Sequence, residues 1–160
     1  MKILSRFYQK WIVERIKGRN TLLAISIGVV YLWFGFLKFF PEVSPAEGLA
    51  KNTIHALTFG FIGDQVSIIL LAILEVGIGL LFVLNIFKKT AIYVALIHMA
   101  CTFTPFLLFV EDSFVAAPFI PTLLGQYIGK NIIIVGALLT LLYTGTSTSR
   151  QNGLNKKKGK

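Results

Sequence analysis

The stretch from Val66 to Phe87 constrains the fold of this chain more than any other. Its 22 residues contain a single ionisable side chain, Glu75, near the middle. About 20 helical residues cross the hydrocarbon core of a bilayer, so this stretch is long and apolar enough to be a membrane span. A carboxylate at that depth is costly unless it is paired or protonated. We therefore expect Glu75 to face protein rather than lipid.

The composition predicts one membrane domain. The chain is 55% hydrophobic and has a mean hydropathy of +0.74, well above ordinary soluble domains. Its formal net charge is +9, but most basic residues lie at the two ends and in one short loop. They are better explained as contacts with lipid headgroups than with nucleic acid, which we do not expect as a partner. The single cysteine, Cys101, excludes an intrachain disulfide.

The apolar runs predict an all-α, integral membrane four-helix bundle over residues 20–145. Residues 1–19 carry a hydrophobic stripe at helical spacing with basic residues mostly off it, which predicts an interfacial amphipathic helix. The alternative is a solvated charged tail. Residues 146–160 predict a basic, disordered tail. The four predicted spans are residues 21–40, 66–87, 90–110 and 122–143.

Two local signals add detail between the spans. Ser44, Pro45 and Glu47 are typical of a helix start, and they predict a short helix in the outer loop that runs to about Phe59. We expect this helix to lie across the outer mouth of the bundle. Pro105 predicts a kink in the third span, because proline frees a backbone carbonyl.

The distribution of basic residues predicts the orientation. Of the 16 Lys and Arg residues, 13 fall in the N-terminal segment, the loop between the second and third spans, and the C-terminal tail. These segments share one side of the predicted bundle. Both termini are therefore expected in the cytoplasm.

The spans contain polar residues that could meet at one depth. Counted along their helices, Glu75, Lys130 and Cys101 all lie roughly 12–14 Å below the outer boundary. We hypothesise that Glu75 and Lys130 form an interior ion pair, with His98, Gln126 and Cys101 nearby. The alternative is that this pair only fixes the helix register.

The other polar candidates have structural explanations. Lys38, near the end of the first span, is expected to snorkel to water rather than to form an internal ion pair. His98 is expected to be a hydrogen-bonded bundle histidine rather than a ligand, and Cys101 a small packing residue. No spacing predicts a haem or zinc site.

Three segments resemble the DoxX-like family of small four-helix membrane proteins. They are YLWFGFLK (residues 31–38), LEVGIG (74–79) and LGQYIGKN (124–131). The resemblance implies a bacterial inner (cytoplasmic) membrane location and, as in some relatives, association with quinone-linked oxidoreductases or oxidative-stress complexes. Functional roles known in the family could be transferred only to Lys38, Glu75, Gln126 and Lys130, which are polar residues of the matching segments.

Three functions stay open from the sequence. The first is an accessory or anchoring subunit of a quinone-linked redox or oxidative-stress system, with a quinone headgroup near Glu75, His98 and Lys130. The second is a small proton-coupled transporter in which Glu75 titrates. The third is a structural or assembly protein without chemistry of its own. We assign no catalytic residue, favour a role without enzymatic activity, and expect membrane lipids, a redox-enzyme subunit or a second copy of the chain as partners.

Overall fold

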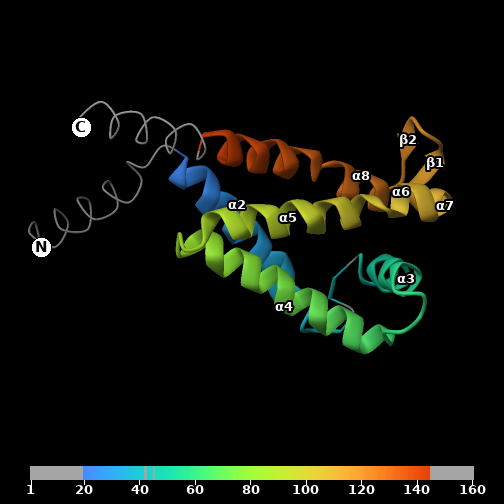
Figure 1. The fold of residues 1–160 in the computed structure, drawn as a ribbon. Coiled ribbons are helices and arrows are strands. Elements are labelled where there is room, and N and C mark those ends of the chain that lie inside the picture. Colours follow the sequence, from blue (N-terminus) through green and yellow to red (C-terminus); the bar gives the residue numbers. More distant parts are fainter. Residues whose placement is uncertain (1–19, 42, 45, 145–160) are drawn as a thin grey trace, which may run out of the picture.

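The computed structural model describes residues 20–144, except 42 and 45. Its long helices are α2 (Thr21–Leu37), α4 (Asp64–Val83), α5 (Lys88–Phe103) and a last helix formed by α8 (Leu123–Gly129) and residues 132–144. They run side by side along the bundle (Figure 1). The interfacial helix predicted at 1–19 and the tail predicted at 146–160 lie outside the described residues.

Among the residues that the structure describes, three helical segments are long and apolar enough to cross a membrane. They are Asp64–Val83, Lys88–Leu108 and Leu123–Thr144, with 20, 21 and 22 residues. The first predicted span, 21–40, is shorter than expected, because α2 has 17 residues and ends at Leu37. At 1.5 Å per residue α2 is about 26 Å long, somewhat less than the roughly 30 Å hydrocarbon core.

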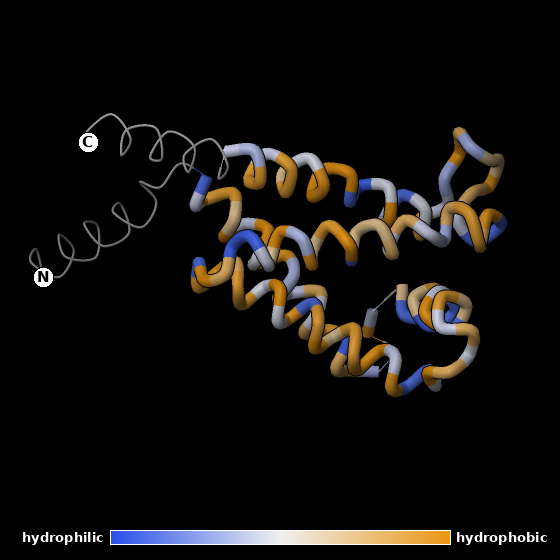
Figure 2. Tube along the Cα trace, in the orientation of Figure 1, coloured by the Kyte–Doolittle hydropathy of each residue, from blue (hydrophilic) through white to orange (hydrophobic). Residues whose placement is uncertain are grey.

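The outer surface of the long helices is apolar, as expected for helices in lipid. Large hydrophobic side chains such as Trp33, Ile73 and Ile97 are more than half exposed. Figure 2 shows hydrophobic residues over most of the length of these helices. A soluble protein rarely exposes so much contiguous apolar surface, so a membrane location explains the pattern better.

The shorter elements gather at one end of the bundle, which we call the α3 end (Figure 1). The predicted loop helix is present as α3 (Glu47–Leu57), but it begins at Glu47, and its N-cap residue, Ala46, provides no side-chain cap. A small antiparallel hairpin, which the sequence did not predict, joins α7 to α8. The remaining elements at this end are α6 (Pro105–Leu108), α7 (Val110–Ser113), β1 (Phe114–Ala116) and β2 (Ile120–Pro121).

The helix is interrupted at Pro105, where the sequence predicted a kink. The helix α5 ends at Phe103, and Pro105 is the first residue of α6. The ring of Pro105 removes the amide donor that would reach the carbonyl of Cys101. Thr104 replaces it, since both its amide nitrogen, at 3.2 Å, and its hydroxyl, at 2.7 Å, donate to that carbonyl.

Glycines bring α2 and α4 into close contact. A Cβ atom built on Gly79 would lie 2.8 Å from the carbonyl oxygen of Gly28 and 2.7 Å from Leu32 Cγ. A Cβ on Gly35 would lie 2.8 Å from the Cβ of Glu75. Because these distances are shorter than real contacts, no larger residue fits without moving a helix. We call this contact of α2 and α4 at Gly28, Gly35 and Gly79 the glycine seam. It resembles the small-residue interfaces of membrane helices.

The seam continues into a buried core shared by the four long helices. Phe82 and Leu138, from α4 and the last helix, are fully buried there. Asn20 Nδ2 donates to Thr144 Oγ1 at 2.6 Å, which ties the start of α2 to the end of the last helix. The buried core residues are Ala24, Ile27, Tyr31, Ile78, Phe82, Ala91, Ile92, Ala95, Met99, Leu138 and Leu141.

We expect Gly79→Ala to destabilise the protein by about 2 kcal/mol, because the added methyl group overpacks the seam. Gly77 is a matched control on the same helix, since a Cβ there meets nothing within 4 Å. Gly77→Ala should therefore be neutral or slightly stabilising. Thermal unfolding of both variants in mild detergent measures the difference, and equal melting temperatures would contradict a close-packed seam.

Candidate functional site

Glu75 forms a buried ion pair with Lys38. The ammonium nitrogen of Lys38 lies 2.6 Å from Oε2 of Glu75, and the two side chains are only 11% and 9% exposed. Lys38 follows the last residue of α2 and also donates to the carbonyl of Phe34 at 3.4 Å. The prediction that Lys38 snorkels to water is therefore wrong. Gly35 explains why, because it lets α2 approach α4 at Glu75, and Lys38 lies on the same face one turn later.

A second set of contacts extends the pair into a polar chain across three helices. Nε2 of His98, on α5, lies 3.4 Å from Oε1 of Glu75. Nδ1 of His98 lies 3.1 Å from the hydroxyl of Tyr31, which also lies 3.5 Å from the carbonyl oxygen of Ala95. Both ring nitrogens of His98 thus have partners, as expected for a hydrogen-bonded bundle histidine.

This chain can hold one more proton without losing a hydrogen bond. When His98 is neutral with its proton on Nε2, it donates to Glu75 and accepts from the Tyr31 hydroxyl at Nδ1. When His98 is protonated, Nδ1 donates to Tyr31 instead, and the Tyr31 hydroxyl turns to the Ala95 carbonyl. Either state is satisfied, so the arrangement is suited to general acid or base work or to proton transfer.

Lys130 does not pair with Glu75, which corrects the predicted ion pair. Its ammonium nitrogen lies 3.9 Å from the ring centroid of Tyr127 and 5.3 Å from that of Phe34. These two rings contact each other edge to face, with centroids 5.7 Å apart. Lys130 is an exposed residue at the end of α8, and it is stabilised there by cation–π contacts.

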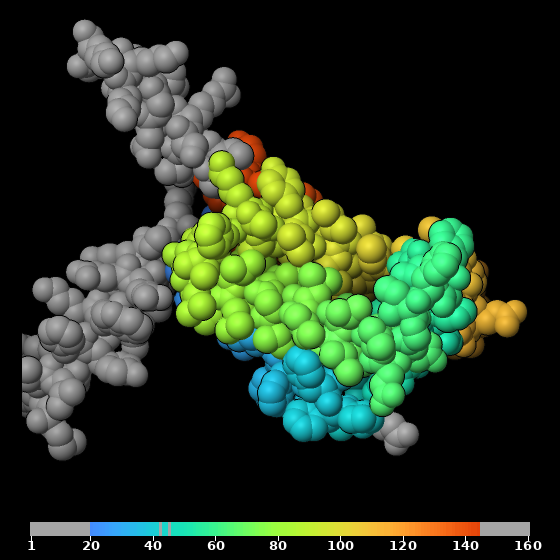
Figure 3. All heavy atoms as spheres, turned by 60° about the horizontal axis from the view of Figure 1, so that its bottom comes forward, coloured from blue at the N-terminus to red at the C-terminus, as the bar shows by residue number. Residues whose placement is uncertain are grey.

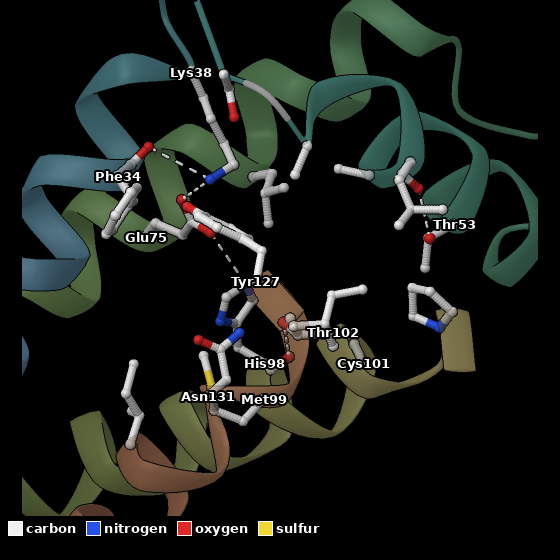
Figure 4. A pocket seen from close by; sticks show the side chains of 18 of the residues that line it. Phe34, Lys38, Thr53, Glu75, His98, Met99, Cys101, Thr102, Tyr127 and Asn131 are labelled. Atoms are coloured by element: carbon white, nitrogen blue, oxygen red, sulfur yellow. Dashed lines mark hydrogen bonds and ion pairs between the residues drawn. The ribbon is translucent and has the colours of Figure 1, made fainter. Parts of the chain in front are cut away.

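A cavity of about 420 Å³ lies beside these residues. Figure 4 shows the side chains of Glu75 and Lys38 on one wall, with His98 and Tyr127 near its centre. Most of the other lining residues are apolar and come from α2, α3, α4, α5 and the last helix. Seven lining residues carry a charge, an amide, an imidazole or a phenol. They are Tyr31, Lys38, Glu75, His98, Tyr127, Lys130 and Asn131.

The loop helix α3 closes the cavity at the α3 end. Leu49, Thr53 and Ile54 line the cavity from this helix. The Thr53 hydroxyl donates to the Leu49 carbonyl at 2.6 Å, so α3 presents a largely apolar surface. Figure 3 shows α3 beside the segment of α7, β1 and β2, over the end of the bundle. The structure therefore agrees with the predicted position of the loop helix across one mouth of the bundle.

Two further predicted site residues differ from expectation. Cys101 is exposed and lines the cavity, so it is not a packing residue. Gln126 is exposed and is absent from the described lining of the cavity. The sequence interpretation also missed the tyrosines and Asn131. The shared helical face of Tyr31 and Lys38 was the signal that could have found the first tyrosine.

Comparison of the chain with known proteins gives no match. No protein-family model, curated protein sequence or solved structure matches the chain. Within the part of the chain that the structure describes, no group of three or more His, Cys, Asp and Glu residues could hold a metal ion. The site must therefore be interpreted from its own geometry.

Removing one partner of the buried pair should be costly. We expect Glu75→Gln or Lys38→Met alone to destabilise the protein by about 3 kcal/mol, because each leaves a charge buried without its partner. The double variant should lose about 2 kcal/mol less unfolding free energy than the sum of the two single variants. Chemical or thermal unfolding of the four proteins gives this coupling energy.

Lys130 supplies the control for that cycle. Because Lys130 does not contact Glu75 within ion-pair distance, Glu75→Gln and Lys130→Met should be additive within about 0.5 kcal/mol. A strong coupling between Glu75 and Lys130, with none between Glu75 and Lys38, would restore the pairing expected from the sequence.

Proposed function

We propose that this membrane protein holds a quinone headgroup in its cavity, as an accessory or anchoring subunit of a redox or oxidative-stress system. The observation that carries the proposal is the cavity itself. Its volume of about 420 Å³ falls in the range of small-molecule sites, roughly 300–1,000 Å³. Such sites combine apolar walls with a few polar groups that orient the ligand.

The chemistry of the lining fits a quinone ring. A quinone has two carbonyl acceptors on a flat, apolar ring, so it needs hydrogen-bond donors beside aromatic or aliphatic walls. Lys130 and Asn131 provide donors from the last helix. Tyr127 and Phe34 provide the aromatic wall.

The position of the cavity fits a ligand dissolved in the membrane. Val30, on α2, and Ile133, on the last helix, both line the cavity and are exposed. Residues exposed in the middle of apolar helices face lipid, so the cavity is open toward the bilayer at this point. The redox part of the proposal and the location in a bacterial inner membrane are what the resemblance of three segments to the DoxX-like family implies.

A second candidate function is proton-coupled transport, with the chain of Tyr31, His98 and Glu75 as the proton-carrying element. The observation in its favour is that this chain accommodates an extra proton with no hydrogen bond lost. Proteoliposomes with an internal pH dye test this candidate. His98→Phe should abolish proton flux. His55→Phe, at an exposed position of α3, is the control and should leave the flux unchanged. Absence of flux in the unmodified protein would exclude proton-coupled transport.

We expect filling the cavity to remove the bound quinone. Ala50→Phe places a ring into the cavity from α3, since Ala50 lines it. Protein purified in mild detergent should then carry at least about ten-fold less quinone, measured by mass spectrometry of its lipid extract, than the unmodified protein.

Ala56→Phe is the matched control for Ala50→Phe. Ala56 lies on the same helix and is exposed, and it is absent from the cavity lining. This variant should retain quinone at the level of the unmodified protein. A gently purified protein that carries no quinone and captures no redox-enzyme subunit would contradict the proposed function.

A further inference from the structure

The charges of the residues that line the cavity do not sum to zero. Three side chains that are charged at neutral pH line it: Lys38, Glu75 and Lys130. Glu75 is matched by Lys38 at 2.6 Å, and it also contacts His98. Lys130 contributes a second ammonium group, and no carboxylate of the described residues lies within 4.0 Å of it. The lining therefore has one positive charge in excess, even with His98 neutral.

The surroundings of Lys130 make this excess charge significant. Lys130 lies about 10 Å along the last helix from Leu123, inside a segment long and apolar enough to cross a membrane. The rings of Tyr127 and Phe34 attract the ammonium group but do not neutralise it. Because Lys130 is exposed and lines the cavity, an anion that enters can reach its ammonium group and form a charge-assisted hydrogen bond with it.

The rest of the cavity is apolar and open to lipid. Phe34, Leu71 and Met99 contribute to its walls, and Val30 and Ile133 lie at its lipid side. A ligand that suits both features has a single negative charge on an apolar body. The cavity has a volume of about 420 Å³, which is the size of a site for one small molecule. A single apolar chain therefore fits it better than the two acyl chains of a phospholipid.

We infer that the cavity binds the carboxylate head of a single-chain anionic amphiphile, such as a fatty acid, with Lys130 pairing with the carboxylate. This inference rests on the proposed use of the cavity as a ligand site. The Lys38–Glu75 pair remains intact beside the ligand, and the donors of Asn131 lie on the same helix as Lys130. The apolar chain of the ligand follows the walls toward the opening at Val30 and Ile133.

Binding of two probes with the same chain length, one with a charged carboxylate and one with a neutral hydroxyl, tests the inference. The full chain is placed in nanodiscs of phosphatidylcholine, which has no net charge, and binding of radiolabelled dodecanoate and dodecanol is measured by scintillation proximity. Dodecanoate should bind at least about ten-fold more tightly than dodecanol, as expected for a charge-assisted hydrogen bond. Equal binding of the two probes would overturn the inference.

Substitutions of lysine identify the residue responsible. Lys130→Met should lower the affinity for dodecanoate roughly ten-fold, to about the affinity of the unmodified protein for dodecanol. Lys130→Arg retains the charge and should stay within about three-fold of the unmodified protein. Lys89→Met removes an exposed lysine that does not line the cavity, and it should have no effect. Full dodecanoate affinity in Lys130→Met would overturn the assignment.

Two further arms separate this inference from its alternatives. Displacement of dodecanoate by added phosphatidylglycerol, in the unmodified protein but not in Lys130→Met, would assign the site to a lipid phosphate and overturn the choice of a carboxylate. Quinone binding without any preference for dodecanoate would overturn this inference and leave the proposed function standing. A preference for dodecanoate without quinone binding would support the inference and contradict the quinone proposal.

Discussion

The ion pair between Lys38 and Glu75 is the interaction on which the rest of the structure depends. Two charges that are almost completely buried inside an apolar bundle carry a large desolvation cost. The short contact between them, with the hydrogen bond from His98, offsets that cost only if α2 and α4 are very close. Gly28, Gly35 and Gly79 provide that closeness. The glycine seam and the polar site are therefore parts of one arrangement.

This dependence also fixes how the helices align. A slip of α2 along α4 by one helical turn, about 5.4 Å, would separate Lys38 from Glu75 and force the glycine positions against larger side chains. Buried ion pairs contribute little net stability but discriminate strongly against arrangements in which they are broken. The pair is thus well suited to select one helix register among several that apolar surfaces alone would allow.

The sequence predicted that Glu75 lies inside the protein, but not which residue it meets. The cost of a carboxylate in lipid was the basis of that prediction, and the Glu75 side chain is only 9% exposed. Which residue meets Glu75 depends on how closely each pair of helices approaches and how each is rotated. The last helix is also interrupted by a turn at Lys130 and Asn131, between α8 and residues 132–144, which no periodicity in the sequence predicts.

The structural and functional interpretations of Glu75 are therefore compatible. Because Lys38 neutralises Glu75, the pair can fix the register permanently while the cavity beside it stays free to bind and release a ligand. A pairing of Glu75 with Lys130 would have tied the last helix to α4 and left Lys38, in place of Lys130, as the unpaired ammonium group of the lining. In the observed arrangement the ammonium group of Lys130 contacts the rings of Tyr127 and Phe34 and forms no ion pair with Glu75, so it is the group that we propose pairs with an anionic ligand.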